Sequence, residues 1–216
     1  MHLKRSEMPR AWPVPRKGTA YLARASHSKD SGISILFILR DLLKLARTRK
    51  EARYVLRNGN ITINNKVRKD ENFPVQVFDT IGLDKLKKYY RLDIVNGKFN
   101  LVEISAKETE RKIVKISGKK IINAKTIQMN LEDGQNFISH SKFSLGDSVV
   151  VNTKENKVEK ILELKEGAKL EIVAGKYAGE EGKLKQIRAL KRGTDYIVKI
   201  NDKEVELPLK TFLVIE

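Results

Sequence analysis

Short apolar runs separated by turn dipeptides fill this chain of 216 residues from residue 61 onward, and no other feature constrains its fold as much. Asn96-Gly97 lies between two of these runs and is the strongest short-range signal of a β-hairpin. Asp133-Gly134 and Gly146-Asp147 separate further runs in the same way. We therefore expect strands at residues 61–63, 89–95, 98–104, 113–116, 126–131, 149–151, 170–173, 182–187, 196–200 and 212–215, the last four of them in a small barrel.

The segment before these strands has helical spacing instead. Isoleucine, leucine and alanine side chains recur on one face over residues 35–46, which predicts a buried helix face. Thr48 and Glu51 then form the pattern of a capping box, which starts a second, short helix at Arg49. That helix is expected to end at Asn58-Gly59, where the left-handed conformation is readily adopted.

Residues 1–32 are expected to form an extended basic arm. Pro9, Pro13 and Pro15 fix backbone angles and remove amide donors, which disfavours a helix. The arm has little apolar surface of its own and is expected to become ordered only when it binds a partner. Trp12, the single tryptophan, can either stack on a base or fill a groove in the neighbouring domain, and the sequence leaves both roles open.

The positive charge of the chain is concentrated near its N-terminus. The formal net charge is +17; residues 1–31 carry seven basic and two acidic side chains, and residues 40–70 carry ten and three. The first 70 residues thus hold +12 of the net charge. Lysine and arginine release condensed counterions when they meet phosphates, so this concentration predicts a polyanionic partner. A surplus that served only solubility would be spread more evenly.

The short helix supplies the first candidates for RNA contacts. Arg49, Arg53 and Arg57 lie four residues apart on one helix face, and like charges at that spacing repel one another unless an anion lies opposite. The helix N-terminus adds a positive dipole. A face that is merely solvated is the alternative, and the combined charges favour RNA. The candidates from the arm and the helix are Lys4, Arg5, Arg10, Trp12, Arg16, Lys17, Arg47, Arg49, Lys50, Arg53 and Arg57.

The order of these elements resembles the small RNA-binding fold known as the S4 domain. A leucine-rich helix is followed by Thr48-Arg49-Lys50-Glu51-Ala52, by a helix ending at Leu56-Arg57-Asn58-Gly59, and by Ile61-Thr62-Ile63-Asn64-Asn65-Lys66-Val67. The S4 domain presents its second helix and the following hairpin to RNA. The resemblance therefore implies RNA contacts by Arg49, Lys50, Arg53, Arg57 and Lys66.

A wider resemblance covers essentially the whole chain. Met1-His2-Leu3-Lys4-Arg5, Lys66-Val67-Arg68-Lys69-Asp70 before Phe73-Pro74, Phe78-Asp79 before Ile81, and residues 126–134 are similar to the S4e family of small-subunit ribosomal proteins of archaea and eukaryotes. Asn65 departs from the family pattern, in which glycine is usual at this position. The resemblance implies 16S-type rRNA as the ligand, neighbouring ribosomal proteins as further partners, and Arg68 as another candidate contact.

The C-terminal part resembles the KOW motif of ribosomal proteins and transcription elongation factors. The resemblance rests on Leu170, Ile172, Val173, Gly175, Gly179, Gly182 and Leu184. Glycine permits positive φ and a close approach to an RNA backbone. Residues 183–192 contain five basic and no acidic side chains, which favours RNA contact over the alternative of a plain hairpin turn. The candidates here are Gly175, Lys176, Gly179, Gly182, Lys183, Lys185, Arg188 and Arg192.

Nothing in the sequence predicts an enzyme. His2, His27 and His140 are far apart, so neither a metal cluster nor a histidine-based catalytic pair is indicated. Cysteine is absent, which excludes disulfides and thiolate sites. The spacing of a P-loop is also absent, because Leu184 stands where a magnesium-binding hydroxyl would be needed. No apolar run suits a bilayer or a signal peptide, so we expect a cytoplasmic protein with no cofactor, no membrane partner and no small-molecule substrate.

These observations predict an α+β fold that is mainly β. We expect an extended basic arm (1–32), an S4-like RNA-binding domain with the following hairpin (33–105), a central β domain (106–168) and a C-terminal SH3-like KOW barrel (169–216). The expected function is a structural one in the small ribosomal subunit, with rRNA bound through several basic modules during assembly and translation. Two alternatives remain open: an RNA-binding transcription elongation factor, and an rRNA-modifying enzyme that uses the S4-like domain for targeting.

Overall fold

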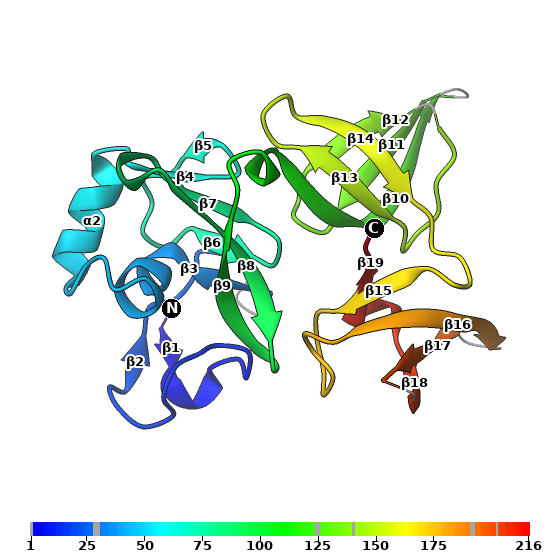
Figure 1. Ribbon diagram of the computed structural model, residues 1–216, viewed down its shortest axis with the longest axis horizontal. Helices are drawn as coiled ribbons and strands as arrows, with labels where there is room; N and C mark the ends of the chain where they lie inside the picture. Colours follow the sequence, from blue (N-terminus) through cyan, green and yellow to red (C-terminus); the bar gives the residue numbers. More distant parts are fainter. Residues whose placement is uncertain (1, 28–30, 124–125, 140, 191–192, 202) are drawn as a thin grey trace. The chain divides into compact units, whose positions relative to one another are not determined.

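The computed structural model describes residues 2–27, 31–123, 126–139, 141–190, 193–201 and 203–216 and divides them between two compact units (Figure 1). The first unit comprises residues 1–94 and 98–110, and the second comprises residues 95–97 and 111–216. Strands dominate both units, which confirms the prediction of a mainly β fold of the α+β class. Within the described ranges, no helix is long and apolar enough to pass through a bilayer.

The N-terminal segment of the first unit is folded and has a buried anchor. Its elements are β1 (Leu3–Lys4), a 3-10 turn η1 (Arg5–Glu7) and β2 (Tyr21–Leu22), with β1 and β2 paired antiparallel. The side chain of Trp12 is only 1% exposed, and its ring centroid lies 6.1 Å from that of Phe37. Trp12 therefore fills a groove, and the prediction that it contacts RNA is wrong. The same anchor attaches this segment to the first unit, while ordering of the arm on binding stays a prediction.

The predicted helix over residues 35–46 is shorter than expected. The helical elements are α1 (Ile35–Phe37), a π-helical turn η2 (Ile38–Leu42) and α2 (Arg49–Arg57). Ile35, Leu39 and Ala46 are buried, so the predicted apolar face is present. The helix ends early because Lys44 adopts a left-handed conformation with φ of 53°.

The bounds of α2 agree with its capping signals. Thr48 Oγ1 accepts a hydrogen bond from the Glu51 amide at 3.3 Å, and the Glu51 carboxylate accepts one from the Arg47 amide at 2.8 Å. The first contact satisfies an amide that the first turn leaves without a helical partner, and the second connects that turn to the residue before the N-cap. At the other end, Gly59 has φ of 70° and donates to the Leu56 carbonyl at 3.0 Å. The predicted start and end of this helix are both confirmed.

Two sheets complete the first unit. Its strands are β3 (Gly32–Ser34), β4 (Ile61–Ile63), β5 (Lys66–Val67), β6 (Pro74–Gln76), β7 (Thr80–Leu83), β8 (Lys88–Val95) and β9 (Lys98–Ile104), with 3-10 turns η3 (Asp84–Leu86) and η4 (Glu108–Glu110). β3 pairs with β6, and the other five follow the order β5-β4-β7-β8-β9. Asn64 and Asn65 have φ of 51° and 59°, which is the geometry of a tight hairpin turn. Asparagine tolerates this conformation, so the turn forms without the glycine usual in the S4e pattern.

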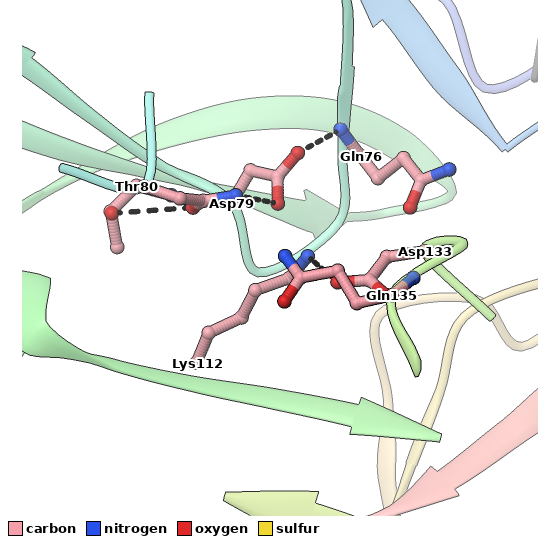
Figure 2. A network of polar contacts seen from close by, with 7 residues as sticks. Gln76, Asp79, Thr80, Lys112, Asp133 and Gln135 are labelled. Carbon is pink, nitrogen blue, oxygen red and sulfur yellow. Dashed lines mark hydrogen bonds and ion pairs between the residues drawn. The ribbon is translucent and has the colours of Figure 1, made fainter. Parts of the chain in front are cut away.

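The second unit holds two five-stranded antiparallel sheets. The first contains β10 (Arg111–Asn123), β11 (Thr126–Leu131), β12 (Asn136–Ser139), β13 (Ser148–Asn152) and β14 (Lys157–Leu162) in the order β12-β11-β10-β13-β14. The second contains β15 (Lys169–Ile172), β16 (Glu181–Leu190), β17 (Gly193–Ile200), β18 (Lys203–Leu207) and β19 (Phe212–Val214), with a 3-10 turn η5 (Leu209–Thr211), in the order β18-β17-β16-β15-β19. In the first of these sheets the Nζ of Lys112 lies 2.9 Å from Asp133 Oδ2, and both side chains are buried (Figure 2).

Strand β13 is buried on both faces, because it contributes to two cores. Val149 and Val151 pack with Met129 in the core of the first sheet of the second unit. Val150 points the other way and packs with Phe212 in the core of the C-terminal sheet. The predicted boundary after residue 168 thus falls between two sheets whose cores both contain side chains of β13. The four-part division of the chain stays a prediction.

Candidate nucleic-acid interface

Helix α2 presents a basic face opposite its buried apolar face. Ala52 and Leu56 are fully buried, which fixes the rotation of the helix against the first unit. Lys50 and Arg57 are exposed, as is Arg47 just before the helix. The predicted separation of an apolar and a basic side is therefore present, and the basic side is open to a large ligand.

Glu71 lies against two of the three arginines of this face. Its carboxylate accepts hydrogen bonds from Arg49 Nε at 3.0 Å and Nη2 at 2.7 Å, and from Arg53 Nη2 at 2.6 Å. The Glu71 side chain is only 10% exposed, whereas those of Arg49 and Arg53 are 60% and 41% exposed. Chiefly through the hydrogen bond from Arg49, these partners lower the pKa of Glu71 to about 2. The Glu71 carboxylate is therefore ionised at neutral pH.

This pairing changes the interpretation of the predicted arginine row. An internal carboxylate already relieves the repulsion between Arg49 and Arg53, so their spacing alone does not require a phosphate opposite. Two-point pairing with Glu71 fixes the direction of the Arg49 guanidinium while leaving most of it exposed. Among the described residues, none forms an ion pair with Arg57. The row therefore combines two oriented guanidinium groups with one that is unpaired.

The hairpin after α2 is held in place by Asp79. Asp79 Oδ2 accepts from the Gln76 amide at 2.7 Å (Figure 2). Asp79 Oδ1 accepts from Asn64 Nδ2 at 2.8 Å. Asn64 Oδ1 in turn accepts from the Thr80 amide at 3.0 Å. Asn64 begins the turn that leads into β5, so this network sets the position of Lys66. The Phe78-Asp79 pair of the sequence pattern thus has a structural role.

Arg68, predicted as an RNA contact, lies over an aromatic ring. Its guanidinium carbon is 4.4 Å from the ring centroid of Phe73, a distance suited to a cation–π contact. Its side chain is half-buried, whereas Lys66 is exposed. Of these two predicted contacts, Lys66 is the more accessible to a ligand.

Among the predicted RNA contacts of the N-terminal segment, Arg5 forms hydrogen bonds within the segment, whereas the other basic side chains are exposed. Arg5 donates from Nε to the Thr19 carbonyl at 2.7 Å, from Nη2 to Thr19 Oγ1 at 2.9 Å, and from Nη1 to the Pro15 carbonyl. Arg5 thus closes the loop that connects β1 with β2. The side chains of Lys4, Arg10, Arg16 and Lys17 are exposed.

The glycines of the C-terminal candidate loop have two different roles. Gly175 and Gly179 have φ of 100° and 91°, so they require the conformational freedom that the sequence predicted. Gly182 lies within β16 instead, where a Cβ atom would be 2.6 Å from Val198 Cγ1. Its lack of a side chain therefore serves the packing of β16 on β17, and its approach to RNA stays a prediction. Lys176 is exposed in the loop.

The basic run on β16 is partly balanced by acids of another strand. Lys185 forms an ion pair with Glu204, and Arg188 Nη1 lies 3.5 Å from Glu206 Oε1. Both acids belong to β18, and the sequence analysis did not connect them with the run. Lys183 is exposed, and Arg192 lies outside the described residues. The positive charge of this surface is consequently lower than the run alone suggests.

Comparison with known proteins decides the family. The S4 domain matches residues 40–81, and the family described as Ribosomal family S4e matches residues 86–158. A protein named Small ribosomal subunit protein eS4 from Methanocella arvoryzae is 34% identical over 207 residues, which cover 94% of this chain and 88% of that protein. The chain belongs to the ribosomal family S4e. This membership confirms the resemblance seen in the sequence.

Other S4e proteins show the same similarity. The protein of the same name from Methanosphaera stadtmanae is 35% identical over 87% of this chain and 79% of its own length. The crystal structure of the 30S ribosomal protein S4e from Thermoplasma acidophilum has a TM-score of 0.75 and 27% identity, covering 87% of this chain and 96% of that one. The S4 match contains α2, β4, β5 and Glu71, so the arginine–carboxylate cluster lies inside the S4 domain of this S4e chain. The KOW resemblance stays a prediction.

Proposed function

We propose that this chain is a structural constituent of the small ribosomal subunit that binds rRNA through several basic surfaces. The observation that carries the proposal is the α2 face, where Glu71 orients Arg49 and Arg53 beside the exposed Arg57. The names of the S4e relatives support the ribosomal setting. The role is structural and not catalytic, and it places the chain on ribosomes in the cytoplasm.

Each surface contributes a different part of the binding. Oriented guanidinium groups on α2 contact phosphates, which position a protein on RNA without reading its sequence. Lys66 on the hairpin and the exposed lysines and arginines of the N-terminal segment extend this contact. The loop containing Gly175, Lys176 and Gly179 provides a second, separate contact. Because the surfaces are linked in one chain, modest individual affinities combine into stable attachment.

The S4e membership favours this role over both alternatives from the sequence. An elongation factor built around the C-terminal sheet has no expected use for the S4 domain. An rRNA-modifying enzyme would need a further catalytic domain, whereas residues 111–162 contribute strands and turns to one five-stranded sheet of the second unit.

Sedimentation of a cell lysate through a sucrose gradient tests the proposal directly. We expect the chain at one copy per small subunit, and we expect it to remain there after a high-salt wash. Loss on washing, or a peak with RNA polymerase or with free protein, would contradict an integral role. Chemical footprinting of rRNA in subunits assembled with and without the chain would then map the contacts of each surface.

A further inference from the structure

A cleft of about 590 Å³ opens in the first unit between the N-terminal segment and the helical region. β2, the residues after it, η2 and the first residue of α2 contribute to its walls. Its size falls within the range of about 300–1,000 Å³ that small-molecule sites occupy. None of the predicted RNA contacts except Arg49 lines it, so the cleft is distinct from the outer face of α2.

The polar side chains of this cleft suit an anion. Arg24, Arg40 and Arg49 line it, and no aspartate or glutamate is among the described residues that do so. Glu71 uses two of the five N–H donors of Arg49, which leaves three for a ligand in a fixed orientation. Arg40 is paired on one side with the neighbouring Asp41 at 2.7 Å.

The remaining lining suits a flat apolar group. The ring of Tyr21 is 59% exposed and lies 5.4 Å from the ring of His2, with an angle of 54° between the two planes. Leu3 and Leu36 are buried residues of the same cleft and provide an apolar base. An inorganic anion would not stack on the aromatic ring, and an apolar ligand would not pair with the three guanidinium groups. A nucleotide uses both, because its base stacks on aromatic rings and its phosphates bind arginine.

We propose that this cleft binds one unstacked nucleotide of an RNA strand, with the base against Tyr21 and the flanking phosphates at Arg24, Arg40 and Arg49. The proposal rests on the proposed function, since it assumes an RNA partner. It adds a preference for RNA in which a nucleotide is free to leave the stack, such as a bulge or a loop. Contacts of α2 with phosphates alone supply no such preference.

Fluorescence titration of the full chain with two hairpin RNAs tests the cleft. One hairpin carries a single bulged fluorescent adenine analogue, and the other has the same sequence with that analogue paired. We expect the bulged hairpin to bind about 10-fold more tightly, which is the size that one base–aromatic stack supplies. Tyr21→Ala should reduce the difference to within about 2-fold, while Tyr21→Phe should keep it.

Two controls separate the cleft from general RNA binding. Tyr54→Ala removes a tyrosine that is 69% exposed on α2, and it should leave the preference for the bulge intact. Arg24→Gln should weaken binding of the bulged hairpin more than binding of the paired one. If the wild-type chain binds both hairpins equally, the cleft proposal is wrong and the proposed function stands. If it binds neither, both fail. Displacement of the bulged hairpin by micromolar AMP would overturn the assignment to RNA and make this a mononucleotide site.

Discussion

The ammonium group of Lys115 donates a hydrogen bond to the carbonyl of Phe212 at 2.7 Å and lies 5.1 Å from the centroid of the same residue's ring. Lys115 belongs to β10 and Phe212 to β19, so a buried cation connects the two sheets of the second unit. The carbonyl of Leu209 accepts a further hydrogen bond from Lys115. Ser148, which pairs with Lys115 in the ladder of β10 and β13, accepts from the Val214 amide at 2.9 Å. One ladder position thus fixes β19 at two points.

The stability of the second unit should depend on the protonation of Lys115. Burial lowers the pKa of Lys115 from its ordinary value of 10.5 to about 8. Between these two pH values the unfolded chain binds more protons than the folded one, so the free energy of unfolding rises with pH across that window. We expect wild-type protein to gain about 1–3 kcal/mol more than Lys115→Met between pH 8 and pH 10.5 in urea unfolding experiments.

Lys119→Met is the matched control for this prediction. Lys119 lies on the same strand, donates to the Phe143 carbonyl at 3.1 Å and lies 5.0 Å from a phenylalanine ring, but it is exposed. Its replacement should leave the wild-type pH dependence unchanged. If Lys115→Met also retains the full rise with pH, the titration belongs to other groups and Lys115 is only a packing element.

Glu71→Gln should strengthen the dependence of RNA binding on salt. The substitution removes one negative charge from beside Arg49 and Arg53 while preserving the shape of the side chain. We expect the slope of log K against log salt concentration to steepen by up to about one unit. Glu103→Gln removes an exposed carboxylate from β9 and should leave the slope unchanged. An unchanged slope in Glu71→Gln would mean that the two arginines do not meet phosphates.

Glu71 should also stabilise the folded chain in a pH-dependent way. Its pKa is lowered from 4.5 to about 2, chiefly by the hydrogen bond from Arg49. The stabilisation is therefore complete above pH 4.5 and is lost as the pH falls towards 2. We expect it to be about 1 kcal/mol, because water screens Arg49 and Arg53. In urea unfolding, Glu71→Gln should differ from wild type above pH 4.5 and converge with it near pH 2.

The sequence predicted an element correctly where the residues that start or end it lie within or next to that element. The capping pair of Thr48 and Glu51 predicted the start of α2, and Asn58-Gly59 predicted its end. Asn96-Gly97 predicted the turn between β8 and β9.

Strand β10 was expected over four residues and extends over 13. Lys112 and Lys115 interrupt its apolar pattern, yet both are buried, because Asp133 and the backbone carbonyls before and within β19 compensate their charges. These partners lie at least 20 residues away in the chain.

The same limit explains what was missed at the candidate interface. The charge pattern identified the arginines of α2, but Glu71 lies 22 residues beyond Arg49 and reaches it only through the turn before β6. Glu204 and Glu206 meet the basic run on β16 in the same way, through pairing of strands that the run itself does not specify. Composition therefore predicts where basic side chains are concentrated. Tertiary structure decides which of them form ion pairs with acidic residues of the chain and which remain available to a ligand.

Asp79→Ala should loosen the hairpin that carries Lys66. The Asp79 carboxylate is buried and accepts hydrogen bonds from Gln76 and Asn64, so its removal leaves two donors without their acceptor. We expect a loss of about 1–3 kcal/mol in the free energy of unfolding. Asp84→Ala, at an exposed position in the neighbouring turn, should change it by less than about 0.5 kcal/mol. Amide exchange at Thr80 should accelerate in Asp79→Ala, and unchanged exchange would show that Asp79 does not support the Asn64 turn.

Arg57→Gln and Arg49→Gln should separate RNA binding from stability on one helix face. Arg57 is exposed and unpaired among the described residues, so its loss should flatten the salt slope of rRNA binding by about one unit and change stability by less than about 0.5 kcal/mol. Arg49 holds Glu71 through two hydrogen bonds, so Arg49→Gln should also cost about 1 kcal/mol of stability.

Lys157→Gln provides the control for both variants, because it removes an exposed positive charge from β14, which belongs to none of the proposed surfaces. Its salt slope should match that of wild type. Filter binding of rRNA over a series of salt concentrations, together with urea unfolding of each variant, gives both quantities. If Arg57→Gln leaves the slope unchanged as well, the basic face of α2 is only solvated. Attachment to rRNA would then depend on the N-terminal segment and the C-terminal loop, which share no residue with that face.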